Sequence, residues 1–172
     1  MPLTPSQLTA LKNDIAADPS LSGLANTPDN NQAIATVYNA EASPSFYVYR
    51  TRVMESEYTD TSGVDVANGN QTTNWSWTTF INRSAGERDG WHRMFQRGFV
   101  NPAFATVRQA FADIFSGAGG VAQRNHLAVL SLRKATRAEK LFATGAGSFA
   151  SPAAMTFEGS LTYQDVTQAR SA

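Results

Sequence analysis

Residues 3–19 read LTPSQLTALKNDIAADP and carry the signals of an amphipathic helix. Thr4 is a suitable N-cap, Pro5 suits the first helical position, and Gln7 stands where it completes a capping box. The leucine and isoleucine side chains that follow recur at intervals of three and four residues, so they share one narrow face. The stretch therefore predicts a helix that ends before Pro19 and needs a partner surface to be stable.

Similar signals recur along the chain and predict a mainly α protein, a small helical bundle. A second helix is expected from Pro28, with Thr27 as its N-cap. The capping box that begins at Ser84 predicts a further helix, and Gly145 is expected to end the longest helix, over residues 121–144. Shorter helical patterns follow Asn101-Pro102 and Thr162.

The β component is expected to be minor. Residues 46–54 are rich in aromatic and β-branched side chains and predict a strand or hairpin, and residues 155–159 predict a short strand. Residues 55–73 are polar and predict a variable loop. A Gly/Ala/Ser-rich linker then divides the chain into a helical domain, residues 1–147, and an extended C-terminal arm, residues 148–172.

Composition favours a subunit whose faces are covered by neighbours. Only 16% of the 172 residues are charged. Of all 172 residues, 58 are Ala, Thr or Ser. The absence of cysteine excludes disulfide scaffolds, zinc ribbons and thiol nucleophiles. No signal peptide or membrane-spanning run is recognisable, so we expect an intracellular protein or part of a particle assembled in the host cytoplasm.

The charges are distributed unevenly. Residues 1–80 carry three basic and eight acidic side chains, a net charge of −5, and residues 81–172 carry eleven basic and six acidic side chains, a net charge of +5. The two halves can neutralise each other within one monomer or pair between copies. For the second case, the candidate intersubunit residues are Glu55, Glu57, Asp60, Arg83, Arg88, Arg93 and Arg97.

The sequence does not predict an enzyme, a metal site or a cofactor. The two histidines, His92 and His126, are too few for a site built from several imidazoles. An S-x-x-K pattern begins at Ser131, but the further motifs of acyl-enzymes are missing. The glycine-rich run at residues 117–120 is better explained as a turn between two helices than as a phosphate-binding loop.

Basic residues gather on the expected longest helix. Three of them are spaced at i, i+4 and i+7 and would share one face. Such a stripe can follow the phosphate backbone of packaged DNA, or it can be a solvated or subunit-facing surface. The stripe consists of Arg124, Arg133, Lys134, Arg137 and Lys140.

Four aromatic residues, Trp75, Trp77, Phe80 and Trp91, form a dense cluster for so polar a chain. Core packing is the ordinary role of such a cluster. Because tryptophan also dominates the energetics of protein interfaces, one face of the cluster can lie between subunits.

Four stretches together resemble a family of small virion-associated proteins encoded by tailed bacteriophages and prophages. They are residues 3–19, RSAGERD at 83–89, DIFSG at 113–117 and RKATRAEKLFATG at 133–145. The resemblance covers both ends of the chain and is poor over residues 53–73. It implies a structural protein of the virion more firmly than it implies a specific place in the particle.

Size and helical build then favour a head–tail connector, or adaptor, of the virion neck. Proteins of that kind form a ring beneath the portal, expected to be about twelvefold, and line the DNA channel between the portal and a tail or nozzle protein. The alternatives are a tail-completion or capsid-decorating subunit, and a cytoplasmic assembly factor or regulator. In a connector the C-terminal arm would dock on the portal through Met155, Phe157, Tyr163, Val166 and Arg170.

Overall fold

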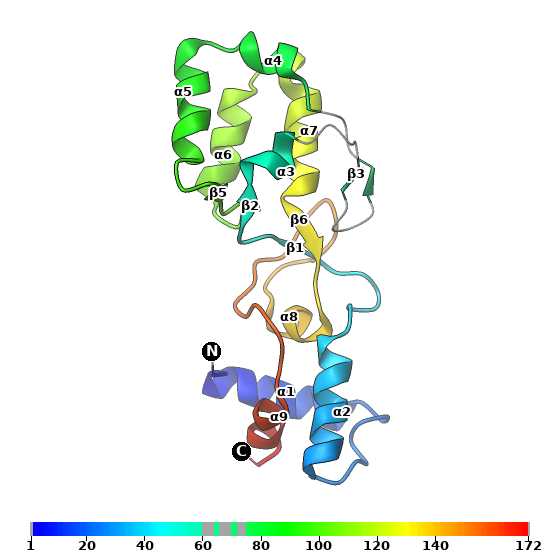
Figure 1. Ribbon diagram of the computed structural model, residues 1–172. Helices are drawn as coiled ribbons and strands as arrows, with labels where there is room; N and C mark the ends of the chain where they lie inside the picture. Colours follow the sequence, from blue (N-terminus) through cyan, green and yellow to red (C-terminus); the bar gives the residue numbers. More distant parts are fainter. Residues whose placement is uncertain (1, 60–63, 66–69, 72–74, 172) are drawn as a thin grey trace. The chain divides into compact units, whose positions relative to one another are not determined.

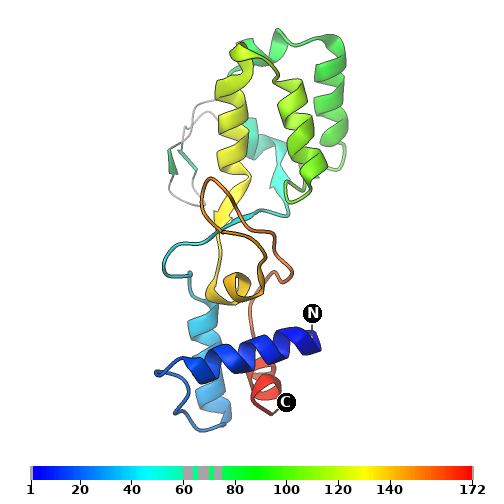
Figure 2. The same cartoon turned by 180° about the vertical axis from the view of Figure 1, so that it is seen from behind.

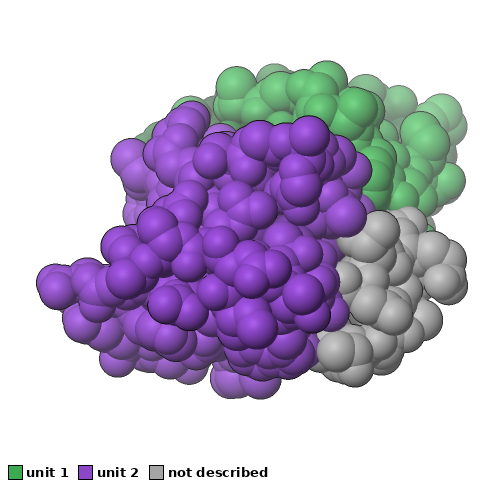
Figure 3. Space-filling model, turned by 90° about the horizontal axis from the view of Figure 1, so that it is seen from above, with its two compact units in different colours: residues 1–48, 134–172 green, residues 49–133 purple. Residues whose placement is uncertain are grey.

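The computed structural model is mainly helical, as the sequence predicts, with small two-stranded sheets (Figure 1). It describes residues 2–59, 64–65, 70–71 and 75–171. The chain divides into two compact units: unit 1 comprises residues 1–48 and 134–172, and unit 2 comprises residues 49–133 (Figure 3). The chain leaves unit 1 in strand β1 (Tyr47–Tyr49) and returns to it in strand β6 (Leu132–Lys134), and these two strands pair.

Unit 1 is a small bundle in which helices from both ends of the sequence lie together. Its helices are α1 (Pro5–Ala17), α2 (Pro28–Asn39), α8 (Arg137–Phe142) and α9 (Tyr163–Ser171). Helix α9 packs against both α1 and α2 (Figures 1 and 2). Their shared core is built from aliphatic side chains such as Leu11, Ile34 and Val166, none of which is exposed to solvent.

The first two helices follow the sequence prediction closely. Thr4 and Gln7 form the expected capping box, and the C-cap of α1 is Asp18, the residue before Pro19. Thr27 caps α2, with Pro28 at its first position. The N-capping residues fix where both helices begin. Each helix buries its apolar face in the core of unit 1, and this core is the partner surface that such short helices need.

The C-terminal segment belongs to the core of unit 1, so the expected arm over residues 148–172 is wrong. Phe157, Leu161, Val166 and Ala169 are buried among side chains of α1 and α2. Small residues contribute to this packing as well, because Ala169 fills space between closely packed helices. The expected boundary after residue 147 therefore does not separate two structural parts.

Unit 2 is also mainly helical. Its helices are α3 (Glu55–Thr59), α4 (Trp77–Ile81), α5 (Ala85–Met94), α6 (Ala105–Ile114), the 3-10 turn η1 (Ala118–Gly120) and α7 (Val121–Leu130). Its short strands are β2 (Val53–Met54), β3 (Val64–Asp65), β4 (Asn70–Gln71) and β5 (Phe99–Val100). Strands β2 and β5 pair antiparallel, with Val53 opposite Val100, and β3 pairs antiparallel with β4.

The core of unit 2 is aromatic. Trp91 of α5 is its centre: the Trp91 ring lies 5.1 Å from Trp75, 4.7 Å from Phe95 and 5.9 Å from Phe111, measured between centroids. Helices α5, α6 and α7 lie side by side around these rings (Figure 1). This cluster confirms the core role that the sequence gives to Trp75, Phe80 and Trp91.

The single long helix expected over residues 121–144 is wrong. Helix α7 ends at Leu130, residues 132–134 form a strand, and a new helix begins at Arg137. Thr136 caps this helix and forms a capping box with Glu139. The break therefore has a local cause, because a capping box satisfies backbone donors that only a helix start exposes.

The β expectations are partly wrong as well. Within residues 46–54 there are two strands, but β1 pairs with β6 and β2 with β5, so they do not form a hairpin with each other. Residues 155–159 are not a strand; the adjacent Ala153 and Ala154 instead form isolated bridges. The expected loop over 55–73 begins with a helix, because Tyr58 is fully buried and fixes α3 to the core.

Candidate functional site

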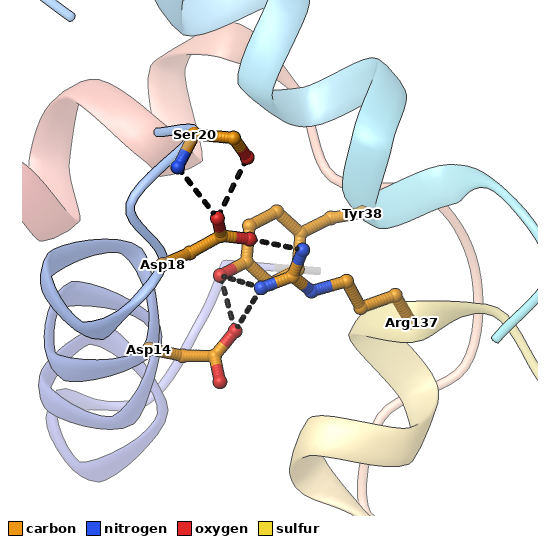
Figure 4. Close-up of polar contacts among 5 residues, drawn as sticks. All are labelled: Asp14, Asp18, Ser20, Tyr38 and Arg137. Atoms are coloured by element: carbon orange, nitrogen blue, oxygen red, sulfur yellow. Dashed lines mark hydrogen bonds and ion pairs between the residues drawn. The ribbon is translucent and has the colours of Figure 1, made fainter. Parts of the chain in front are cut away.

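A cluster of ion pairs centred on Arg137 joins three helices of unit 1 (Figure 4). The Arg137 guanidinium donates to the Asp14 carboxylate and to the Asp18 carboxylate, both at 2.8 Å. The Tyr38 hydroxyl donates to the same Asp14 oxygen at 2.5 Å. Asp18 also accepts from the backbone N–H of Ser20 at 2.9 Å and from the Ser20 hydroxyl at 2.6 Å.

The ionisation of this cluster is fixed by its contacts. Hydrogen bonds from Ser20, and then from Arg137, lower the pKa of Asp18 to about 2. Burial and the hydrogen bond to Asp14 raise the pKa of Tyr38, which stays a neutral donor at physiological pH. Burial alone would lower the pKa of Arg137, but the two carboxylates outweigh it and raise that pKa. Asp18 and Arg137 are therefore an ionised pair at pH 7, and Tyr38 takes part in the cluster as a neutral donor.

A cavity of about 740 Å³ opens beside this cluster, within the size range of ligand-binding pockets. Part of its wall is apolar and includes Val37 of α2 and Leu141 of α8. The charged lining residues are Asp14, Glu41, Arg137 and Lys140. The cavity thus combines a small apolar surface with charges of both signs.

Three of these four charged residues are already paired. Asp14 and Arg137 pair with each other, and Glu41 accepts from Lys134 at 3.1 Å. The fourth, Lys140, lies over the Phe46 ring with its Nζ 5.8 Å from the ring centroid. No carboxylate among the described residues lies within ion-pair distance of this ammonium.

A second candidate surface lies on α4 in unit 2. Trp77 is 53% exposed and Ile81 is 57% exposed, and the two residues are one helical turn apart. Between them, Phe80 points into the aromatic core. The Trp77 ring lies edge-on to Trp75 at 5.6 Å and to Phe80 at 5.8 Å between centroids, so the core supports the exposed ring from below.

The basic residues expected on one helix do not form a stripe. Arg124 donates to the carbonyl oxygens of Phe115 and Gly117 and fastens the turn before α7. Arg133 belongs to β6, at the end of unit 2. Lys134, Arg137 and Lys140 belong to unit 1, where Arg137 and Lys140 line the cavity and Lys134 holds Glu41.

Most residues expected to pair between copies have intramolecular partners instead. Glu55 accepts from the Trp91 indole N–H at 2.6 Å, and Glu57 pairs with Arg50 at 2.5 Å. Arg83 and Arg88 donate to the backbone carbonyls of Ser116 and Ile81. Arg93 pairs with Asp89. Arg97 is exposed, and Asp60 lies outside the residues that the structure describes.

The residues expected to dock on a portal mostly serve the fold of unit 1. Phe157 and Val166 are buried in its core, and Met155 packs on a small cluster around Val48. Arg170 donates to the side-chain oxygen of Asn31 at 2.7 Å and to the backbone carbonyl oxygens of Leu24 and Ala25. Tyr163 remains 40% exposed.

Two polar side chains considered for chemistry, Ser131 and His126, are buried and form hydrogen bonds within unit 2. The Ser131 hydroxyl donates to the Leu127 carbonyl at 2.7 Å, so its contact with the Tyr58 hydroxyl, at 2.8 Å, is one that Ser131 accepts. His126 Nε2 lies 2.6 Å from the Tyr58 carbonyl oxygen and must donate to it. The described residues contain no group of three or more His, Cys, Asp or Glu side chains that could hold a metal ion.

Sequence reasoning missed the acidic and aromatic partners of Arg137. Asp14 and Asp18 lie one turn apart on the exposed side of the predicted first helix, a spacing that can hold one guanidinium from two sides. Tyr38 stands on the second helix, where nothing in the local sequence indicates a polar role. No local signal in the sequence pairs residues that lie about a hundred or more positions apart.

Comparison with known proteins finds no matching family model, no matching curated protein and no matching solved structure. None of the helices in the part of the chain that the structure describes has the length and hydrophobicity needed to cross a membrane.

Proposed function

We propose that this chain is a structural subunit of a tailed-phage particle, a head–tail connector that assembles into a ring under the portal. The exposed face of α4, with Trp77 and Ile81 at its surface, is the observation that carries the proposal. Large aromatic and aliphatic side chains fixed in place at a surface are typical of contacts between subunits. The ion pairs and buried hydroxyls serve the fold, which suits a structural role.

Rigidity of the α4 face supports the proposal further. Trp77 rests on Trp75 and Phe80, so little side-chain freedom is lost when a neighbouring subunit covers it. A preorganised aromatic residue contributes more to association than a mobile one, because its side chain loses less conformational entropy on binding. The same face suits either neighbouring copies in a ring or the next component of the neck.

The DNA channel of such a ring would not be lined by a basic stripe along one helix, because the basic residues lie on separate elements. Arg124, Lys134 and Arg137 are engaged within their own units. Likewise, Glu55 and Glu57 are bound inside unit 2, which leaves apolar contact, rather than charge pairing through these two residues, as the expected basis of assembly.

Mass photometry of the purified full chain, followed by negative-stain imaging, tests this proposal. We expect rings in the wild type and loss of rings in the double variant Trp77→Ser/Ile81→Ser, with an unchanged circular dichroism spectrum. Tyr163→Ser, which removes an exposed aromatic side chain from unit 1, is the matched control and should still assemble. A wild type that stays monomeric at all accessible concentrations would argue against the ring.

A further inference from the structure

We propose that the cavity of unit 1 beside Arg137 is a docking pocket for an acidic peptide segment of a partner protein. This inference rests on the proposed role in a particle, where subunits are joined by segments of their neighbours. The segment would place an aliphatic side chain against Val37 and Leu141 and a carboxylate on the ammonium of Lys140.

The size and walls of the cavity suit such an occupant. Its volume of about 740 Å³ is that of a site for a small ligand or a few residues of peptide. Val37 is 40% exposed although it stands on a helix of the core bundle, so an apolar surface is left open there. Covering it with an aliphatic side chain would remove apolar area from water.

The charged residues that line the cavity indicate which polar group the bound segment should carry. Arg137 is held by two carboxylates at 2.8 Å and has little capacity for a third. Glu41 is held by Lys134. Lys140 is the one lining cation for which the described residues provide no carboxylate, and its ammonium lies 5.8 Å from the centroid of the Phe46 ring. A carboxylate on Lys140 would complete the pairing of every charged residue in the lining.

The rigid surroundings favour a preformed pocket. Arg137 fixes α8 to α1 through Asp14 and Asp18, and Lys140 and Leu141 follow on the same short helix. The backbone N–H of Arg137 also donates to the Ala40 carbonyl at 2.9 Å, which fixes α8 to the end of α2. The lining residues therefore come from three elements that are tied to one another, and binding needs little rearrangement.

Selection from a random heptapeptide library on the immobilised full chain tests the pocket. We expect enriched peptides to share an Asp or Glu next to Leu, Ile or Val. Single capped peptides from this pool should lose affinity about tenfold on Lys140→Gln, and a similar amount when their acid is changed to its amide. Lys12→Gln, which removes an exposed lysine of α1 outside the lining, should leave affinity unchanged.

The site is confirmed if amide signals of Val37, Ala40 and Leu141 shift in NMR spectra on titration with such a peptide. Absence of enrichment, or peptides that bind the Lys140→Gln variant as tightly as the wild type, would overturn the inference. Because ring assembly is measured without any peptide, failure of the pocket and failure of the connector proposal give different results.

Discussion

The ring of Tyr38 lies under the guanidinium of Arg137, with 4.5 Å between the guanidinium carbon and the ring centroid. The two residues are about a hundred positions apart in the sequence, and both also contact Asp14 (Figure 4). The aromatic face of Tyr38 and the carboxylate of Asp14 therefore both hold Arg137, the first residue of α8. Stacking and ion pairing on the same guanidinium are typical of arginine and not of lysine.

Arg137→Gln is expected to destabilise unit 1 by about 1–3 kcal/mol, because it leaves two partly buried carboxylates without their cation. Lys140→Gln, on the same helix, should change stability by less than about 0.5 kcal/mol, since no carboxylate in the part of the chain that the structure describes pairs with it. Chemical denaturation of both variants measures the difference. Equal stabilities would show that the cluster contributes nothing to the fold.

The acid sensitivity of the protein should depend on Asp18. Its pKa is lowered to about 2 in the folded chain, against about 3.9 in an unfolded chain, so it contributes stability above about pH 4 that is lost as the pH falls toward 2. Asp18→Asn should therefore be less stable than the wild type at pH 7. Thermal melts between pH 7 and 2 should show a shallower decline for this variant, and parallel curves would contradict the assignment.

Removal of residues 150–172 is expected to unfold unit 1, because it takes away four buried side chains of its core. A milder change, Val166→Ala, should cost about 2 kcal/mol through lost burial and the cavity that remains. Tyr163→Ala, near the exposed start of the same helix, is the control and should be nearly neutral. A truncated chain that melts like the wild type would restore the interpretation of this segment as an arm.

The turn between α6 and α7 should tolerate a side chain at one glycine and reject it at the next. A Cβ on Gly120 would overlap the carbonyl oxygen of Phe115, whereas a Cβ on Gly119 meets nothing within 4 Å. That carbonyl is also held by Arg124 and cannot easily move. We expect Gly120→Ala to cost about 1–3 kcal/mol and Gly119→Ala to be neutral or slightly stabilising, as measured by urea denaturation.

Local signals explain which elements the sequence predicted correctly. The helices that begin after Thr4, Thr27 and Ser84 start at residues whose side chains cap the backbone, and this information lies within four positions of each start. Thr136 and Glu139 carry the same signal at the start of α8, and the single long helix expected from the sequence runs through it in place of α7, β6 and α8. The basic stripe depended on the common face of that single helix, and the division into α7, β6 and α8 removes this face.

Tertiary relationships account for the remaining differences. The burial of Val166 and Phe157 depends on α1 and α2, far away in sequence, and the local composition of a Gly/Ala/Ser linker gives no sign of it. The partners of Glu55 and Arg137 are likewise distant. A net-charge pattern along the chain could not show that these residues bind within one subunit instead of between two.

The copy number of this protein in purified phage particles tests the proposed structural role most directly. Quantitative mass spectrometry would measure it against the portal and major capsid proteins of the same particles. A connector ring predicts a number equal to that of the portal, about twelve per particle. Absence from the particle, or a number that follows the major capsid protein into the hundreds, would contradict a place at the head–tail junction.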